Sequence, residues 1–202
     1  MNIEVINLGP MDNCTYLVTQ GDSALLIDPA WDMNFLEHTL KEKKLNLLAV
    51  FFTHGHFDHV KFAQDLLQRT GVKAYIEEKD ILLSGIDAQY LHPYCGKQTF
   101  DLGPFHIDII PTPGHTAGCV CIQIGNALFT GDTLFPGACG RVDLPTSNPR
   151  QMRQSLLALS KLPEDTQIFA GHSYGGKCSS TIGYERIKNP FMRNAIRDEE
   201  TL

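Results

Sequence analysis

Short apolar segments separated by turn residues open the chain and predict a β-meander. Its three strands are expected at residues 3–8, 14–19 and 24–28, with GPMDN and QGDS forming the turns. Residues 32–44 then place apolar side chains at helical spacing, which predicts a helix. The continuous apolar run LNLLAVFF, over 45–52, is typical of a strand buried on both faces.

Helical and extended patterns continue to alternate along the rest of the chain. Gly71 is expected to end a helix over 58–69, and Asn148 to cap a helix that runs to about residue 160. The stretch 87–99 shows no clear period, which predicts a loop, and the region from 179 onward is mixed. The remaining elements are a short helix near 77–84 and strands at 72–76, 105–112, 119–124, 127–131 and 166–171. Interleaved strands and helices favour an α/β fold in which outer helices cover the sheets.

Composition and charge narrow the function classes. We find no repeat or linker, so residues 1–202 are expected to form a single domain. The net charge of −6 disfavours nonspecific nucleic-acid binding, which needs a basic surface. No apolar run approaches the roughly 20 residues that span a bilayer, and the first residues do not resemble a signal peptide. We therefore expect a cytoplasmic protein with no membrane and no nucleic-acid partner.

The densest chemical feature is THGHFDH, which directly follows the buried strand 45–52. His54 and His56 are two residues apart, so an extended backbone places both imidazoles on one side. Asp58 and His59 follow at the expected start of a helix. Three imidazoles and a carboxylate so close together are costly to bury without a partner, and a divalent metal ion is the obvious one.

Three further candidate ligands stand at the ends of predicted strands. His115, Asp132 and His172 are each preceded by glycine, which lets the backbone approach a site closely. Together with the first cluster they make seven candidate ligands, more than one four-coordinate ion requires. Seven ligands suit two ions that share a bridging carboxylate and activate water. Histidine and carboxylate without thiolate suit Zn(II), Fe(II) or Mn(II). The residues alone therefore predict a dinuclear metallohydrolase.

This pattern, H-x-H-x-D-H followed by His, Asp and His at strand ends, resembles the metallo-β-lactamase fold superfamily. The resemblance covers nearly the whole chain and implies a four-layer αβ/βα sandwich with the metals at one edge of the two sheets. It implies that Asp132 bridges both metals. It assigns one metal to His54, His56 and His115 and the other to Asp58, His59 and His172.

Within that superfamily, the segment GDTLFPGACGRVD is similar to the glyoxalase II-like hydrolases. The resemblance to these hydrolases implies that the protein hydrolyses a small-molecule thioester, S-acylglutathione or another acyl-thiol, by a metal-bridging hydroxide. It implies two divalent ions, zinc foremost, with Asp58 as the catalytic carboxylate that orients the hydroxide. It also places Arg141 and Tyr174 against the substrate. Few residues follow His172, so the C-terminal helical domain that helps full-length glyoxalase II bind glutathione is not expected.

The same residues are compatible with two other functions. Persulfide dioxygenases share the fold and a similar GCGR-D segment, and they use one iron at positions matching His54, His115 and Asp132. A metal-binding protein without catalysis is a third hypothesis. Residues 87–99, with His92 and Tyr94, are a candidate substrate loop over the metals. The acyl group, the thiol carrier, the metal and the oligomeric state are not determined by the residues.

Overall fold

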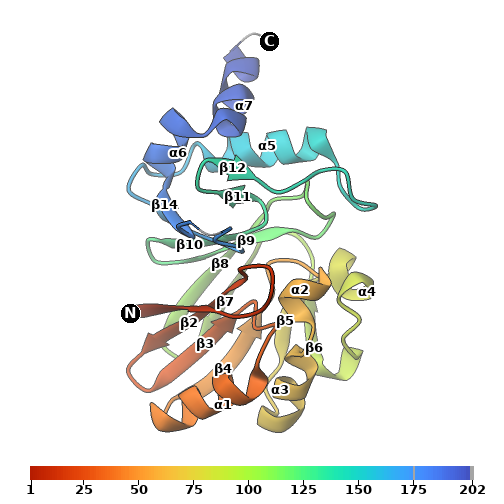
Figure 1. Cartoon of the computed structure of the whole chain (residues 1–202), viewed down its shortest axis with the longest axis vertical. Coiled ribbons are helices and arrows are strands. Elements are labelled where there is room, and N and C mark those ends of the chain that lie inside the picture. The colour runs from red at the N-terminus through yellow and green to blue at the C-terminus, as the bar shows by residue number, and fades with distance from the viewer. Residues whose placement is uncertain (175, 201–202) are drawn as a thin grey trace.

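The computed structural model describes residues 1–174 and 176–200, which contain two six-stranded mixed sheets (Figure 1). In the first sheet the strands follow chain order. The pairs β1–β2 and β2–β3 are antiparallel, and the strands from β3 to β6 run parallel to one another. They are β1 (Asn2–Asn7), β2 (Cys14–Gln20), β3 (Ser23–Ile27), β4 (Asn46–Phe51), β5 (Ala74–Glu77) and β6 (Leu91–Tyr94).

The second sheet has the order β14-β13-β10-β9-β8-β7, and in it only β10 and β13 run parallel. A two-stranded ribbon follows β10 and leads toward the last helices. The strands are β7 (Gln98–Leu102), β8 (Phe105–Pro111), β9 (Val120–Ile124), β10 (Ala127–Gly131), β13 (Gln167–Ala170) and β14 (Ser179–Thr181), with the ribbon β11 (Leu134–Phe135) and β12 (Ala138–Cys139).

Helices cover the outer face of each sheet, which gives the expected αβ/βα layers (Figure 1). The first sheet carries α1 (Met33–Glu42), α2 (Phe57–Val60), α3 (Ala63–Thr70) and α4 (Ile81–Ser84), with short 3-10 turns η1 (Glu78–Asp80) and η2 (Ala88–Tyr90). The second carries α5 (Pro149–Leu159), α6 (Ile182–Lys188) and α7 (Pro190–Glu200).

Three buried apolar clusters hold these layers together. One lies between the first sheet and its helices and includes Leu36 and Leu66, which α1 and α3 contribute. The second fills the space between the two sheets around Phe51 and Phe129. The third joins the second sheet to α5 and α7. Burial of apolar surface, at about 25 cal/mol per Å², is the main stabilising term for each layer contact.

Local signals in the sequence explain where several elements begin and end. The Asn148 side chain accepts a hydrogen bond from the Gln151 amide at 3.0 Å, which caps α5 as predicted. Gly71 ends α3 with a left-handed φ of 73°, a conformation that favours glycine. The predicted helix over 58–69 is wrong in one respect, because the structure divides it into α2 and α3. The Phe62 amide donates to the Ala30 carbonyl at 3.1 Å instead of continuing the helix.

The predicted loop over 87–99 is also wrong. It contains η2, the edge strand β6 and the start of β7. In β6, Leu91 and Tyr94 are buried and the two residues between them are exposed, so four residues show no alternation. Backbone pairing with β5 forms this strand without a side-chain pattern. The mixed region after 179 forms β14, α6 and α7.

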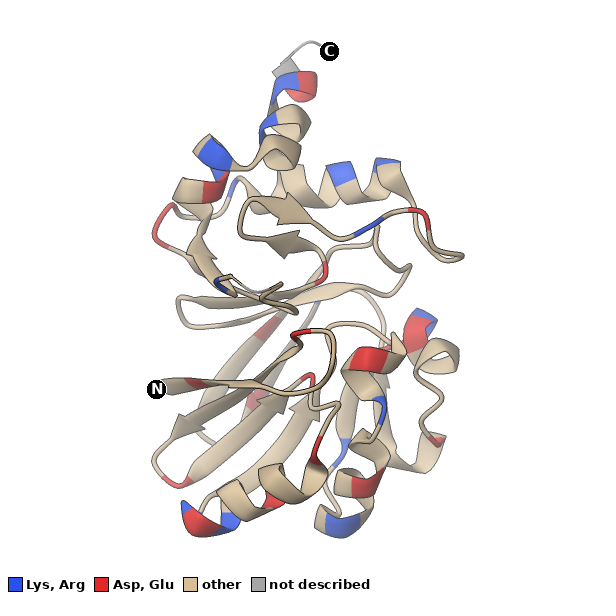
Figure 2. Ribbon diagram, viewed as in Figure 1, with Lys and Arg blue, Asp and Glu red and all other residues tan. Residues whose placement is uncertain are grey.

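Basic and acidic residues both occur on several of the outer helices, as Figure 2 shows. Within the described part of the chain, no helix combines the length and the apolar content that crossing a membrane requires.

Candidate metal centre

Four loops that follow strand ends meet at one edge of the sandwich. The loop after β4 carries His54 and His56, and it leads into α2 with Asp58 and His59. His115 follows β8, Asp132 follows β10 and His172 follows β13. The structure therefore brings together all seven residues that the sequence predicts as metal ligands.

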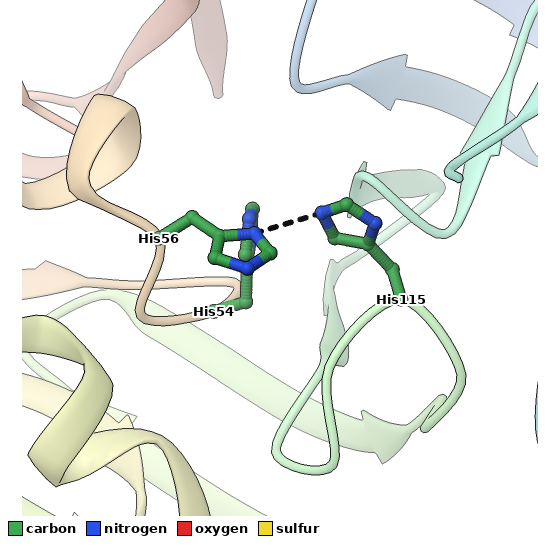
Figure 3. A group of neighbouring side chains, drawn as sticks. All are labelled: His54, His56 and His115. Atoms are coloured by element: carbon green, nitrogen blue, oxygen red, sulfur yellow. Dashed lines mark hydrogen bonds between the residues drawn. The ribbon is translucent and has the colours of Figure 1, made fainter. Parts of the chain in front are cut away.

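His54, His56 and His115 form one group, in which ligand atoms lie within 4.8 Å of one another. Figure 3 shows the His56 and His115 rings approaching each other from two separate loops, with His54 overlapping His56 in this view. The His56 Nδ1 and His115 Nε2 atoms are 2.9 Å apart. Two imidazole nitrogens this close share either a proton or a cation. This geometry fits one metal position.

Asp58, His59 and His172 form a second group, whose ligand atoms also lie within 4.8 Å of one another. The Nε2 atoms of His59 and His172 are 3.2 Å apart. Asp132 lies between the two groups. Its Oδ2 is 3.5 Å from Nε2 of both His115 and His172, and its Oδ1 is 3.4 Å from the His59 Nε2. A carboxylate in that place can bridge two ions.

The Nδ1 atoms of His59, His115 and His172 each have an oxygen partner. Nδ1 of His115 bonds the Arg141 carbonyl at 2.8 Å, and Nδ1 of His172 bonds the Met11 carbonyl at the same distance. Nδ1 of His59 bonds Asp28 at 2.9 Å. Such partners orient metal-binding histidines and leave the Nε2 lone pair free to bind.

Two buried atoms support the fit to cations. The His54 Nε2 and the Asp132 Oδ1 are buried and have no hydrogen-bond partner within the described residues. Leaving a buried polar atom unpaired costs about 1–3 kcal/mol. Both atoms are electron-pair donors that point into the His/Asp cluster, so a bound cation satisfies them and a hydrophobic neighbour does not.

The electrostatics of the cluster agree with this arrangement. Burial lowers the pKa of His54 and of His56 and keeps both imidazoles neutral, the form that binds metal. Burial of Asp132 opposes its charge, but His59 and His172 outweigh burial and hold its pKa well below the usual range. Burial likewise opposes the charge of Asp58, and contacts with His172 and His59 lower its pKa to about 2. Both carboxylates are therefore anionic at neutral pH, the form that metal binding requires.

Two buried aspartates hold the cluster in position. Neither is predicted from the sequence as a site residue. Asp28 accepts hydrogen bonds from the Thr53 amide at 2.7 Å and the Thr53 hydroxyl at 2.6 Å, besides contacting His59. Asp80 accepts from the amides of Gly55 and Gly118, each at 2.9 Å, and so joins two of the loops. The only sequence signal for Asp28 is an acidic residue at the end of an apolar strand.

A third such residue, Asn13, holds Asp58. Its Nδ2 donates to the Asp58 backbone oxygen and to Oδ2, both at 3.0 Å. Asn13 comes from the turn between β1 and β2, and it pairs with His172 in an isolated bridge. The first strand turn therefore supports the site, although its sequence predicts only a turn.

Gly171 illustrates why glycine precedes these ligands. A Cβ at this position would lie 2.4 Å from Asp132 Oδ1 and 2.7 Å from His59 Cε1. We expect Gly171→Ala to displace two ligands and to lower bound metal at least several-fold, measured by elemental analysis. Gly125→Ala is the matched control, since it strains a left-handed turn of φ 60° with nothing within 4 Å. Equal metal content in both variants would contradict this prediction.

Five residues of the cluster line a cavity of about 580 Å³, namely His56, Asp58, His115, Asp132 and His172. Arg141 and Tyr174, the two residues that the resemblance places against the substrate, both line it. The Tyr174 ring stacks on His172 with centroids 4.9 Å apart, and its backbone has a φ of 44°, unusual for a bulky residue. Burial raises the pKa of Tyr174 to about 12, so its hydroxyl is neutral.

The hypothesis that residues 87–99 reach over the metals is wrong. None of the described residues that line the cavity comes from this stretch. His92 instead lies beside Tyr75, with ring centroids 4.5 Å apart, because β6 pairs with β5 at the edge of the first sheet.

Comparison with known proteins places this geometry in a family. The family model for the metallo-beta-lactamase superfamily matches residues 9–172. The chain is 33% identical to the hydroxyacylglutathione hydrolase GloC of Haemophilus influenzae, over 96% of this chain and 99% of GloC. It is 34% identical to BaeB of Bacillus velezensis, over 77% of this chain and 69% of BaeB. BaeB is described as a probable polyketide biosynthesis zinc-dependent hydrolase.

A solved structure agrees with the sequence comparisons. The crystal structure of TTHA1623 in a di-iron-bound form has a TM-score of 0.81 and 31% identity, over 93% of this chain and 99% of that one. The match to the family model covers most of the chain and includes all seven residues of the His/Asp cluster. The chain therefore belongs to the metallo-beta-lactamase superfamily.

Proposed function

We propose that the protein is a dinuclear metal-dependent hydrolase of thioesters. The observation that carries the proposal is the pair of ligand groups with Asp132 between them, at the floor of an open cavity. The similarity to GloC, named as a hydroxyacylglutathione hydrolase, supports a thioester as the substrate class. The predicted ligand set follows: His54, His56 and His115 for one ion, Asp58, His59 and His172 for the other, and Asp132 for both.

When bound by these residues, two divalent cations would supply a water of lowered pKa and an electrophile for the developing oxyanion. Relatives described as zinc-dependent and di-iron-bound support Zn(II) or Fe(II) as the ions, and Mn(II) also suits these ligands. The residues of the chain supply binding and orientation.

Asp58 lines the cavity and has Oδ2 3.3 Å from His172 Nε2. Its carboxylate is positioned to accept a hydrogen bond from the attacking water and so to direct a lone pair toward the carbonyl carbon. A thiolate is a good leaving group, so the site needs no strong general acid. Arg141 and Tyr174, at the opening of the cavity, are placed to contact the substrate.

The test combines metal counting with activity. Protein purified without added metal is analysed for metal content, and thiol release is followed with an S-acylglutathione and with an acyl-N-acetylcysteamine. We expect about two ions per chain and thiol release from at least one ester. Chelation should abolish the activity, and added Zn(II) should restore it.

Two further assays separate the competing functions. One iron per chain, with oxygen uptake on a glutathione persulfide and no thiol release, would instead support the dioxygenase. Hydrolysis of a β-lactam without hydrolysis of any thioester would also overturn the proposal. Bound metal without any turnover would point to a non-catalytic metal protein.

A further inference from the structure

Two cysteines that the proposed reaction does not use meet at the end of β13. The Cys14 amide donates to the Gly171 carbonyl, and the Ala170 amide donates to the Cys178 carbonyl, each at 2.8 Å. Both side chains belong to the apolar cluster between the two sheets, and they contact each other directly. Cys14 is only 1% exposed, whereas Cys178 is half-buried. The fold therefore pairs a thiol that small solutes can reach with one that is sheltered.

The surroundings make the two sulfur atoms chemically unequal. The hydrogen bond from the Cys14 thiol lowers the pKa of Cys178 to about 6, with a smaller contribution from the Tyr16 hydroxyl and against the opposing effect of burial. The same hydrogen bond and burial raise the pKa of Cys14 far above its usual range. At neutral pH, Cys178 is thus the thiolate and Cys14 holds the proton between them.

Burial has the opposite effect on three other cysteines. It raises the pKa of Cys121 to about 12 and that of Cys139 to about 11, and it holds the pKa of Cys119 well above the usual range. A protonated thiol is a poor nucleophile, so oxidation should begin at Cys178 rather than at these positions. The sixth cysteine, Cys95, is exposed between β6 and β7 and offers a control.

We propose that Cys178 and Cys14 form a peroxide-reactive modification site that closes to a disulfide. The Cys178 thiolate attacks one oxygen of hydrogen peroxide, the O–O bond breaks, and a sulfenic acid and hydroxide form. The Cys14 sulfur then attacks the Cys178 sulfur and displaces the sulfenic oxygen, which leaves as water with the Cys14 proton. Two thiols and one peroxide thus give one disulfide and two waters, and the two sulfur atoms supply both electrons.

The pair is tied to the metal centre through its neighbours in the chain. Cys14 directly follows Asn13, whose side chain donates to the Asp58 backbone oxygen and to Oδ2, both at 3.0 Å. The carbonyl that accepts from the Cys14 amide belongs to Gly171, which precedes His172. A covalent bond is shorter than a contact between two thiols, so closing the disulfide draws these segments together. The disulfide is therefore expected to displace Asp58 and His172 and to lower turnover.

The primary test reads the modification itself and does not depend on the proposed reaction. The protein loaded with Zn(II), which peroxide does not oxidise, receives one equivalent of hydrogen peroxide. We expect the loss of two hydrogen atoms in the intact mass and of two of the six thiols. Digestion without reductant should give a linked pair of peptides that contain residues 14 and 178. Because this measurement uses the unsubstituted chain, a folding defect in a variant cannot affect it.

Variants assign the order of the two steps. Cys14→Ser should stop at the sulfenic acid on Cys178, which a dimedone probe labels. Cys178→Ser should form neither the labelled product nor the disulfide. Cys95→Ser is the matched control, and it should form the disulfide as the wild type does.

The effect on turnover rests on the proposed thioesterase function and is measured separately. The disulfide should lower kcat for a thioester by at least about tenfold, because a displacement of about 1 Å near a catalytic group can cost about 100-fold. A reductant should restore the rate. Cys178→Ser should keep the rate of the reduced wild type after the same peroxide treatment.

The outcomes separate the two proposals. A linked peptide that lacks residue 14 or 178, or first oxidation at another cysteine, would overturn the modification site even if thioesters are hydrolysed. A mapped disulfide with unchanged turnover would overturn its effect on the metal centre. A mapped disulfide in a protein that hydrolyses no thioester in its reduced form would support the modification site and overturn the proposed reaction.

Discussion

Replacement of Asp58 by alanine is expected to lower kcat for thioester hydrolysis by at least about 100-fold, the scale of a lost general acid-base group. The carboxylate contributes to the second group of ligands and points into the cavity. Its removal takes away both a metal contact and the acceptor that orients the attacking water. Because these contacts act in the transition state, the loss should fall on kcat rather than on KM alone.

The fold should survive this change. Asn13 retains its hydrogen bond to the backbone oxygen of residue 58, so the start of α2 stays attached to the first turn. Circular dichroism and thermal unfolding should show a native protein. Asp65→Ala is the control, since Asp65 is an exposed acidic residue in the first turn of α3. Near-normal turnover in Asp58→Ala would rule out the proposed role of Asp58.

The second large effect is expected at Asp80, which we assign as a positioning residue. This buried carboxylate accepts three hydrogen bonds, from the Gly55 amide, the Gly118 amide and the Thr116 hydroxyl. Gly55 lies between two candidate ligands, and Thr116 directly follows His115. Asp80 thereby fixes the separation of the two loops that form the first ligand group.

Asp80→Ala leaves the amides of Gly55 and Gly118 without a partner and leaves the Thr116 hydroxyl with the Cys119 sulfur as its acceptor. Each unpaired buried group costs about 1–3 kcal/mol. We expect the free energy of unfolding to fall by about 3 kcal/mol or more, measured by urea denaturation of the metal-free protein. Metal affinity should also fall about 10–100-fold, the effect of losing a residue that orients ligands. Excess metal should then restore much of the activity.

Asp80→Asn and Asp87→Ala serve as comparisons. The amide of Asp80→Asn retains one acceptor oxygen, so its effect should be intermediate. Asp87 is an exposed carboxylate close by in sequence, and its removal should change neither stability nor metal affinity appreciably. A stability loss in Asp80→Ala with unchanged metal affinity would show that Asp80 supports the fold alone.

The sequence contained stronger signals for the candidate site, whose seven residues lie together in the structure, than for some of the strands. The seven candidate ligands are polar residues at the ends of apolar strands, and strand ends converge wherever strands share an edge. Their chemistry can therefore be recognised from the order of the residues alone. By contrast, β6 and the two-residue strands β11 and β12 are too short to show a period, and only backbone pairing defines them.

The residues that position the candidate ligands could not be recognised from the sequence. Asn13, Asp28 and Asp80 are ordinary turn or strand-end residues in the sequence, and their roles depend on partners far along the chain. Asp28 contacts His59 at a sequence separation of 31, and Asn13 contacts Asp58 at a separation of 45. Such partners become identifiable only when the chain has folded.

By itself, the sequence determined the α/β class, most of the strands and helices, and a dense set of candidate metal-ligand side chains. Periodicity and residue chemistry are local properties, so the order of residues contains them. The tertiary structure decided how the other six candidate ligands divide around Asp132 and which buried side chains hold them in place. These features depend on distances between separate loops, and only the packing of the two sheets sets those distances.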